Sequence, residues 1–336
     1  MTETLIQLPS ESTLDRAVTL LGEGRLVVLP TETVYGLAAN AWNREAVMRI
    51  FAAKQRPANN PLIVHVASVD RIGEAAALPV DGSTRQQFDA LSDLWPGPLT
   101  LVLPRSEKVP PCVTAGRDTV AVRVPSHPVA TRLLERCPFP IAAPSANRSN
   151  YISPTTAEHC ARGLAGEVEL IIDGGPCDCG VESTIVALDR SGARLLRPGA
   201  VSAEEVARRL DVPIERLIRQ TQFEPGEIES PGMLREHYSP STPLFLLAGN
   251  QAVDVLPRTG RIAFSPLDTA EATQYDRLET LSDSGDLNEV ARRLFAALRR
   301  LDLLGLDQIH VDVCEPIGMG RAIMDRLCRA AAKHQP

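Results

Sequence analysis

The chain has 336 residues, which is more than one ordinary hydrophobic core accommodates, so two domains are expected. Its 44% hydrophobic and 23% charged residues are typical of a globular protein, and the net charge of -7 argues against a broadly basic nucleic-acid binder. This net charge is still compatible with a local cationic cleft. No apolar run approaches the roughly 20 residues that span a bilayer, and the N-terminus lacks the features of a secretory signal. A cytoplasmic protein is therefore expected.

Short apolar runs alternate with amphipathic stretches over the first two-thirds of the chain. The apolar runs predict strands at 25–29, 61–66, 99–103, 120–124, 141–143, 169–172 and 184–188. Helical spacing of apolar residues predicts helices at 13–21, 43–53, 85–94, 129–136, 155–163 and 203–210. Ser12 or Thr13 is the expected cap of the first helix and Asn43 that of the second. The mixture predicts an α/β domain with a sizeable sheet.

The periodic pattern dissolves over residues 211–243, which are rich in Pro, Gly, Ser and charge. Connectors this long are often functional, so a lid that excludes water from a site and a passive tether are both open interpretations. The pattern resumes with strands predicted at 261–264 and 309–313 and helices at 287–304 and 320–332. A G-x-G at Gly318 and Gly320 has Ile323 where a dinucleotide fingerprint needs its third glycine, so we interpret it as strand–helix packing.

Two motifs follow early strands. PTETVYGL, from Pro30 to Leu37, is either a ligand-binding loop at a strand end or a capped turn opening toward the next helix. In KQRPANNPLIVHV, Lys54 and Arg56 either complement a helix dipole or hold phosphate. His65 lies within an apolar strand, where a histidine is more often a core residue than a catalyst.

Three further motifs add polar groups at strand ends. In TVAVRVPSHP, Arg123 interrupts an apolar strand and must face either solvent or a site, because unpaired burial of a charge is costly. APSANRSNYISPT and DGGPCDCGVESTIV, with the LLRPGA that follows, contribute hydroxyls, an amide and a cation at Ser145, Asn147, Ser153, Ser183 and Arg197. Together these groups favour binding of phosphate and a small metabolite, because no nucleophile–base pair is evident.

The seven cysteines are scattered, and only Cys177 and Cys179 are close in sequence. One C-x-C without a second Cys/His pair is weak support for zinc. We therefore expect thiols in a reducing compartment and no metal ligated by protein side chains.

The combined motifs resemble those of the YrdC-type threonylcarbamoyl-AMP synthases. PTETVYGL, the K-x-R of KQR, NPLIVHV, VAVRVP, the S-x-N of PSAN and GVEST occur in the family's order over about residues 10–210. SPGMLREHYSP and IGMGRAIMDRL are similar to the linker and C-terminal domain of the long, two-domain members. The resemblance implies a YrdC-like catalytic domain with a twisted mixed sheet (1–210), a linker that forms an active-site lid (211–243) and a smaller Rossmann-like α/β domain (244–336).

The resemblance also implies a nucleotidyltransferase that forms threonylcarbamoyl-AMP and pyrophosphate from L-threonine, bicarbonate and ATP, with the help of Mg2+. The product would pass to a separate transferase complex that modifies tRNA, so contact with tRNA is indirect. By the same resemblance, threonine is contacted by Thr33, His65, Arg123, Ala143 and Ser183. ATP is contacted by Arg56, Asn60, Thr119, Ser145, Asn147, Ser153, Arg197 and His237, with Tyr238 as the alternative closing residue. Lys54 and Arg56 are the expected catalytic residues.

Two other functions compete with a synthase as interpretations of this sequence. An RNA-binding module without synthase activity is disfavoured by the acidity and by the 4% aromatic content. Carbamoyl transfer to a protein thiol, as in hydrogenase-maturation factors with related domains, would be expected to come with extra zinc-finger regions.

Overall fold

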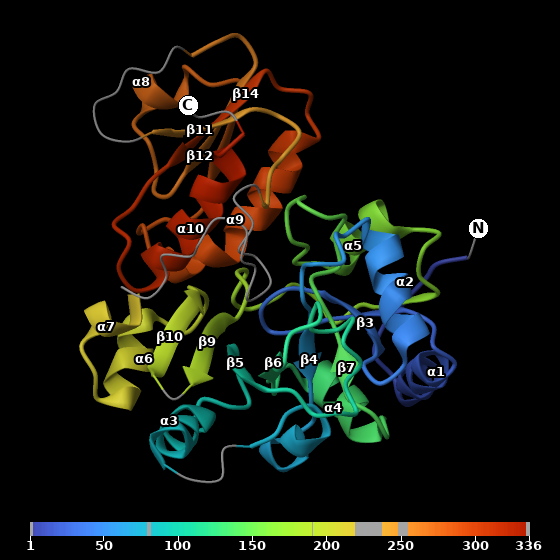
Figure 1. The fold of residues 1–336 in the computed structure, drawn as a ribbon. Coiled ribbons are helices and arrows are strands. Elements are labelled where there is room, and N and C mark those ends of the chain that lie inside the picture. The colour runs from blue at the N-terminus through green and yellow to red at the C-terminus, as the bar shows by residue number, and fades with distance from the viewer. Residues whose placement is uncertain (1–2, 79–81, 190, 219–236, 248–254, 334–336) are drawn as a thin grey trace.

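A computed structural model describes residues 3–78, 82–189, 191–218, 237–247 and 255–333. Two sheets organise these residues, one of ten strands and one of four (Figure 1). The larger sheet is mixed and the smaller is parallel throughout, which confirms the predicted mixed-sheet domain with a second α/β domain. None of the helices in these ranges combines the length and apolar character needed to cross a membrane.

The larger sheet has the strand order β1-β8-β2-β3-β7-β4-β6-β5-β9-β10. Its strands are β1 (Leu5–Gln7), β2 (Val27–Leu29), β3 (Gly36–Asn40), β4 (Ile63–His65), β5 (Leu99–Pro104), β6 (Thr119–Arg123), β7 (Ile141–Ala142), β8 (Leu170–Ile172), β9 (Thr184–Asp189) and β10 (Gly192–Arg197). Parallel and antiparallel pairs alternate near its centre: β4 runs parallel to β6 and antiparallel to β7.

Helices cover this sheet. They are α1 (Glu11–Gly22), α2 (Arg44–Lys54), a 3-10 segment (Val69–Glu74), α3 (Gly82–Ser92), α4 (Pro128–Arg136), α5 (Ala157–Leu164), α6 (Ala203–Leu210) and α7 (Ile214–Ile218). Asn43 caps α2 as predicted, because its side-chain oxygen accepts from the N–H groups of Glu45 and Ala46. The cap of α1 is Ser10 rather than Ser12 or Thr13, since α1 starts two residues earlier than the apolar spacing indicated.

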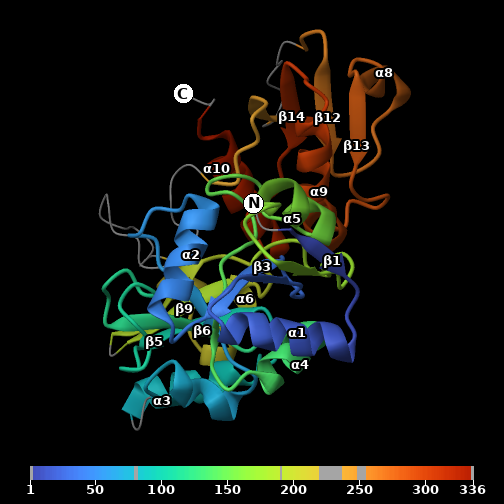
Figure 2. The same ribbon diagram turned by 90° about the vertical axis from the view of Figure 1, so that its right-hand side faces the viewer.

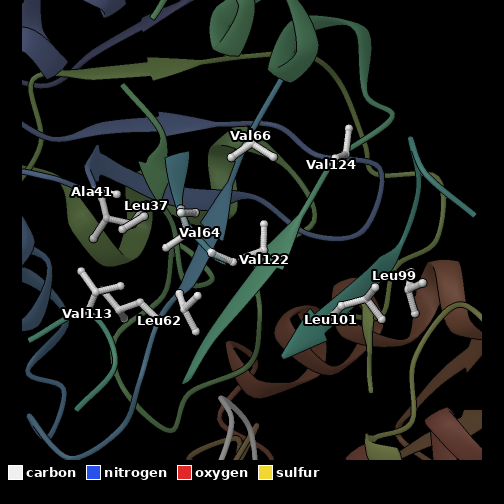
Figure 3. Close-up of a cluster of buried hydrophobic side chains, with 14 of the residues drawn as sticks. Leu37, Ala41, Leu62, Val64, Val66, Leu99, Leu101, Val113, Val122 and Val124 are labelled. Carbon is white, nitrogen blue, oxygen red and sulfur yellow. The ribbon is translucent and has the colours of Figure 1, made fainter. Parts of the chain in front are cut away.

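Aliphatic side chains from the central strands form the main core (Figure 3). Leu62, Val64 and Val66 come from the β4 segment and Val122 and Val124 from the β6 segment, and all five are essentially inaccessible to solvent. Burying a side chain of this size contributes about 1.5–3 kcal/mol relative to leaving it exposed. The centre of the sheet is thus a rigid base for the polar residues at its strand ends.

The smaller domain has the strand order β11-β14-β12-β13. Its elements are β11 (Leu244–Leu247), β12 (Thr259–Ala263), α8 (Thr269–Ala272), β13 (Arg277–Thr280), α9 (Leu287–Asp302), β14 (Gln308–Asp312) and α10 (Met319–Ala331). In Figures 1 and 2, α9 and α10 lie between this sheet and the larger domain. A core cluster joins the two domains, since Phe295 and Leu327 pack in the same cluster as Val34, Ile152 and Val181.

Some elements differ from the predictions. The last two residues of PTETVYGL, Gly36 and Leu37, begin a strand, β3, which pairs antiparallel with β2, so the motif connects two strands and does not open a helix. Strands β1, β10 and β13 and the short helix α8 were not anticipated, because short runs of mixed polarity carry little local signal. Strand β11 was also missed, because its four apolar residues, LFLL, directly follow the irregular connector and are too few to indicate a strand by themselves. Helix α7 lies in the predicted connector, where it packs on α6 and β10. Residues 219–236 of that connector lie outside the described ranges.

Candidate active site

The turn between β2 and β3 is organised by the hydroxyl of Thr31. Its Oγ1 accepts from the N–H groups of Thr33 and Val34, both at 3.2 Å, and donates to the oxygen of Val34 at 2.6 Å. The threonines of PTETVYGL therefore fold a local polar turn, which is the usual use of such residues beside a strand. This turn fixes the Thr33 hydroxyl at the edge of a pocket.

Arg123 ends β6 and faces that pocket, not solvent. Its Nη1 donates to Thr33 Oγ1 at 2.9 Å, and its Nη2 lies 2.6 Å from Glu32 Oε1. Burial alone would raise the pKa of Glu32, but the charge and hydrogen bond of Arg123 outweigh it and lower that pKa below its usual value. Glu32 is consequently a carboxylate at neutral pH, and it holds the arginine in one orientation.

His65 lies beside Arg123 because β4 and β6 pair in parallel with His65 opposite Arg123. Burial, reinforced by the Arg123 charge, lowers the pKa of His65 to about 3. The imidazole is therefore neutral, and within the described part of the chain its Nδ1 has no hydrogen-bond partner. Such a neutral, partly unsatisfied ring beside an arginine is suited to binding a polar ligand.

Arg56 follows the end of α2 and supplies the first of two further cations in the pocket lining. Its Nη2 donates to Asn60 Oδ1 at 2.5 Å and to Pro61 O at 2.9 Å, and its Nε donates to Asn60 O at 3.2 Å. Asn60 thus orients the guanidinium. Burial lowers the pKa of Arg56, but a guanidinium stays charged at neutral pH.

Arg197 supplies the second cation from the end of β10. Its Nη2 donates to Ser183 O at 2.9 Å and to Ser183 Oγ at 3.1 Å. The Ser183 hydroxyl also lies 2.7 Å from Thr100 Oγ1. Among the residues that the structure describes, its partners are thus a cation and a hydroxyl, not the base that would activate a nucleophile.

Lys54 stands behind the pocket wall. Its buried Nζ donates to the main-chain oxygens of Ser145 and Asn147, at 2.5 and 2.6 Å. Burial lowers the pKa of Lys54 well below its usual range, and the nearby Arg56 adds to the effect. Lys54 therefore links the end of α2 to the loop that carries Ser145 and Asn147.

The pocket encloses about 520 Å³ of empty space, including its open mouth. Ten residues singled out from the sequence line it, drawn from all five motifs and the connector: Thr33, Arg56, His65, Arg123, Ala143, Ser145, Ser183, Arg197, His237 and Tyr238. Asn60 and Ser153 contact lining residues, namely Arg56 and Glu182. Lys54 and Asn147 lie behind Ser145, while Thr119 opens β6 at an exposed position outside the lining.

Cys177 and Cys179 do not take part in a metal site within the described part of the chain, where no group of three or more His, Cys, Asp or Glu side chains converges. Burial raises the pKa of both thiols, so they are protonated at neutral pH and are weak ligands in that form.

Two family profiles cover nearly the whole chain. Residues 19–199 match the Sua5/YciO/YrdC family, described as telomere recombination, and residues 201–332 match the C-terminal domain of threonylcarbamoyl-AMP synthase. The chain belongs to the two-domain threonylcarbamoyl-AMP synthase family.

Two named threonylcarbamoyl-AMP synthases are similar over most of their length. That of Pyrococcus abyssi is 41% identical, with 94% of this chain and 93% of the relative covered. That of Bacillus subtilis is 38% identical, with 94% and 92% covered. The crystal structure of P. abyssi Sua5 complexed with L-threonine superimposes with a TM-score of 0.84 at 38% identity, and the match covers 98% of this chain and 97% of that one.

Some residues at the pocket of this threonylcarbamoyl-AMP synthase family member were not predicted from the sequence. Most of them have partners that are distant in the chain. Glu182 and Tyr35 line the pocket, and Arg326 contacts Glu182 from the second domain. Glu182 and Arg326 stand within the GVEST and IGMGRAIMDRL motifs, which was their only signal. Their roles depend on a contact between the two domains, which no local sequence pattern predicts.

Proposed function

We propose that this chain forms threonylcarbamoyl-AMP and pyrophosphate from L-threonine, bicarbonate and ATP. The observation that carries the proposal is the pocket itself. Arg123 contacts Thr33 and lies opposite the neutral His65 in the sheet, and Arg56 and Arg197 add two further cations to the same lining. A zwitterionic amino acid and a polyanion are ligands that such a set of polar groups and cations matches.

The chemistry needs no protein nucleophile. Threonine and bicarbonate condense to an N-carboxylate with loss of water and of the amine proton. A carboxylate oxygen then attacks the α-phosphorus of ATP and pyrophosphate leaves. Because two anions must approach each other, the protein's task is to position them and to neutralise charge. The buried arginines meet that need.

In this proposal, threonine lies against Thr33, His65, Arg123, Ala143 and Ser183. ATP extends past Ser145 and Ser153 toward Arg56 and Arg197, with His237 closing the site and Asn60 orienting Arg56. Lys54 and Asn147 act from behind Ser145 by shaping its loop. Thr119 would reach only a part of ATP that extends beyond the pocket.

Mg2+ would enter with the nucleotide. The Glu182 oxygens are already engaged by Ser153 and Arg326, so the ion's ligands would be phosphate oxygens and water. Mg2+ would offset the triphosphate charge alongside Arg56 and Arg197. We further propose that the product passes in the cytoplasm to a transferase complex that modifies tRNA.

The test is pyrophosphate release from ATP with bicarbonate, with and without labelled threonine. We expect release that depends on threonine and labelled threonylcarbamoyl-AMP as product. Tight RNA binding without such release would favour the RNA-binding module, and threonine-independent release would also contradict the proposal. Arg56→Ala should lower kcat/KM by at least about a hundredfold, because a desolvated cation at the phosphates is lost. Near-normal activity of Arg56→Ala would show that Arg56 is not part of the active site.

A further inference from the structure

An ion pair crosses the domain boundary at the wall of the pocket. Arg326 lies on α10 of the second domain, and its side chain is only 1% exposed. Its Nε donates to Glu182 Oε2 at 2.9 Å and its Nη1 to Pro198 O at 2.7 Å. Asp325 Oδ2 also lies 2.7 Å from Nη1, and the guanidinium lies over the ring of Tyr238, 5.4 Å from its centroid. The arginine is thus held on several sides.

Glu182 lines the pocket and orients the hydroxyl of Ser153. Ser153 donates to its Oε1 at 2.5 Å. Burial alone would raise the pKa of Glu182, but Arg326 and then Arg197 outweigh it and lower that pKa to about 2. The group is therefore a carboxylate at neutral pH. A bare carboxylate in a pocket that receives a triphosphate would repel the ligand, so its neutralisation matters for binding.

A second arginine of the second domain, Arg299 on α9, binds the loop that carries Ser153. The guanidinium of Arg299 donates to the main-chain oxygens of Ile152, through Nη2, and Ser153, through Nε. It also lies over the ring of Tyr151, at 4.9 Å from the centroid. The main chain at residue 153 is thus fixed by α9, and the side chain of Ser153 is fixed through Glu182 by α10.

We propose that Arg326 is a positioning residue of the nucleotide subsite, which neutralises Glu182 and through it orients the Ser153 hydroxyl. The second domain thereby completes the ATP side of a pocket whose threonine side is built by the first domain alone. This inference rests on the proposed function, since it assumes that the triphosphate lies beside Ser153 and Glu182.

The contacts predict an effect that is selective for ATP. Arg326→Met keeps the length and apolar stem of the side chain but removes the direct ion-pair partner of Glu182. The KM for ATP should rise by at least about tenfold, whereas the KM for threonine should stay within about threefold, because Thr33, His65 and Arg123 are untouched. Arg326→Lys restores the charge without the planar fork and should give an intermediate KM for ATP.

A double variant separates charge from packing. In Glu182→Gln/Arg326→Met both charges are absent, so the repulsion disappears and the KM for ATP should return to within about threefold of that of Glu182→Gln alone. This variant also avoids an unpaired buried charge, and hence remains informative if Arg326→Met folds poorly. Arg321→Met is the matched control, since Arg321 lies on the same helix and pairs across the domains with Glu204 at 3.0 Å, away from the pocket lining.

The experiment measures both KM values from pyrophosphate release, with thermal unfolding recorded for every variant. An unchanged KM for ATP in Arg326→Met, an equal rise for ATP and threonine, or a double variant no better than Arg326→Met would each overturn the inference. If the unaltered protein itself releases no threonine-dependent pyrophosphate, the proposed function fails. If the unaltered protein releases threonine-dependent pyrophosphate and the KM for ATP of Arg326→Met is unchanged, only the role of Arg326 is rejected.

Discussion

Lys54 Nζ lies 2.6 Å from the main-chain oxygen of Asn147 and so joins the end of α2 to the loop after β7. The same ammonium donates to Ser145 O, and in return Ser149 N donates to Lys54 O at 2.8 Å. The lysine of the K-x-R motif therefore supports the S-x-N motif from inside the protein. Its neighbour in the motif, Arg56, is the residue that faces the pocket.

Replacing Lys54 with Met should lower both stability and turnover. Two buried carbonyl oxygens would lose their donor, at a cost of about 1–3 kcal/mol in the free energy of unfolding, and the Ser145 loop would lose its support. Urea unfolding and pyrophosphate release measure the two effects. Lys108→Met is the control: this exposed lysine lies over the Trp42 ring at 5.3 Å, and its loss should change stability by less than about 1 kcal/mol. Equal stability of the two variants would contradict the structural role of Lys54.

The buried histidines make stability depend on pH below neutrality. Burial lowers the pKa of both His65 and His237 to about 3, whereas the unfolded chain binds a proton on each near pH 6.5. Between these values the unfolded state holds more protons, so this stabilisation is complete above about pH 6.5 and is lost as the pH falls toward 3.

His65→Gln and His237→Gln should each flatten this dependence. Between pH 6.5 and 5 the slope of the unfolding free energy should decrease by up to about 1.4 kcal/mol per pH unit for each variant. Urea titrations at pH 8, 6.5, 5.5 and 5 measure the slope, and the interval from pH 8 to 6.5 is the internal control. A slope identical to that of the unaltered protein would mean that these rings are protonated in the fold.

The end of the connector should be needed for turnover. His237 and Tyr238 line the pocket, Tyr238 stacks on Phe295 with ring centroids 5.6 Å apart, and Ser239 N donates to Asn150 O at 2.9 Å. Deleting Ser230 to Pro240 should raise the KM for ATP or lower kcat, because the pocket loses this cover and admits water. Steady-state kinetics at varied ATP tests the prediction, and circular dichroism checks that the variant is folded. Unchanged kinetics would leave the connector as a passive tether.

Gly180 should tolerate no side chain. Its φ is +73°, and a Cβ there would lie 2.3 Å from Ala291 O and 2.4 Å from Arg292 Cα on α9. Gly180→Ala should destabilise the protein by roughly 2–4 kcal/mol, since the loop before Glu182 would have to move away from the second domain. Gly163→Ala in α5 is the matched control. A Cβ there meets nothing within 4 Å, and the helix should gain up to about 1 kcal/mol. Thermal unfolding of both variants shows whether each substitution stabilises or destabilises the protein.

Most helices and central strands were predictable because their apolar period is strong and local. The α6 bounds agree with the prediction, and those of α9 differ only at the C-terminal end. β3 was missed because GLAAN is short and lacks an alternating pattern, and its strand conformation comes from pairing with β2 and β7 on either side. The Ser10 cap was missed because the helix extends beyond its apolar stripe.

The sequence by itself determined the chemical character of the site: arginines, hydroxyls and amides at strand ends, in an order that resembles one enzyme family. It also indicated that Arg123 must find a polar environment, because an unpaired charge in an apolar strand is costly. The tertiary structure alone decided which groups meet. Glu182 and Arg326 are 144 positions apart, and their pairing requires α10 to pack against the pocket wall. No local pattern specifies which distant cation neutralises a buried carboxylate, because that choice is made by the packing of whole helices and sheets.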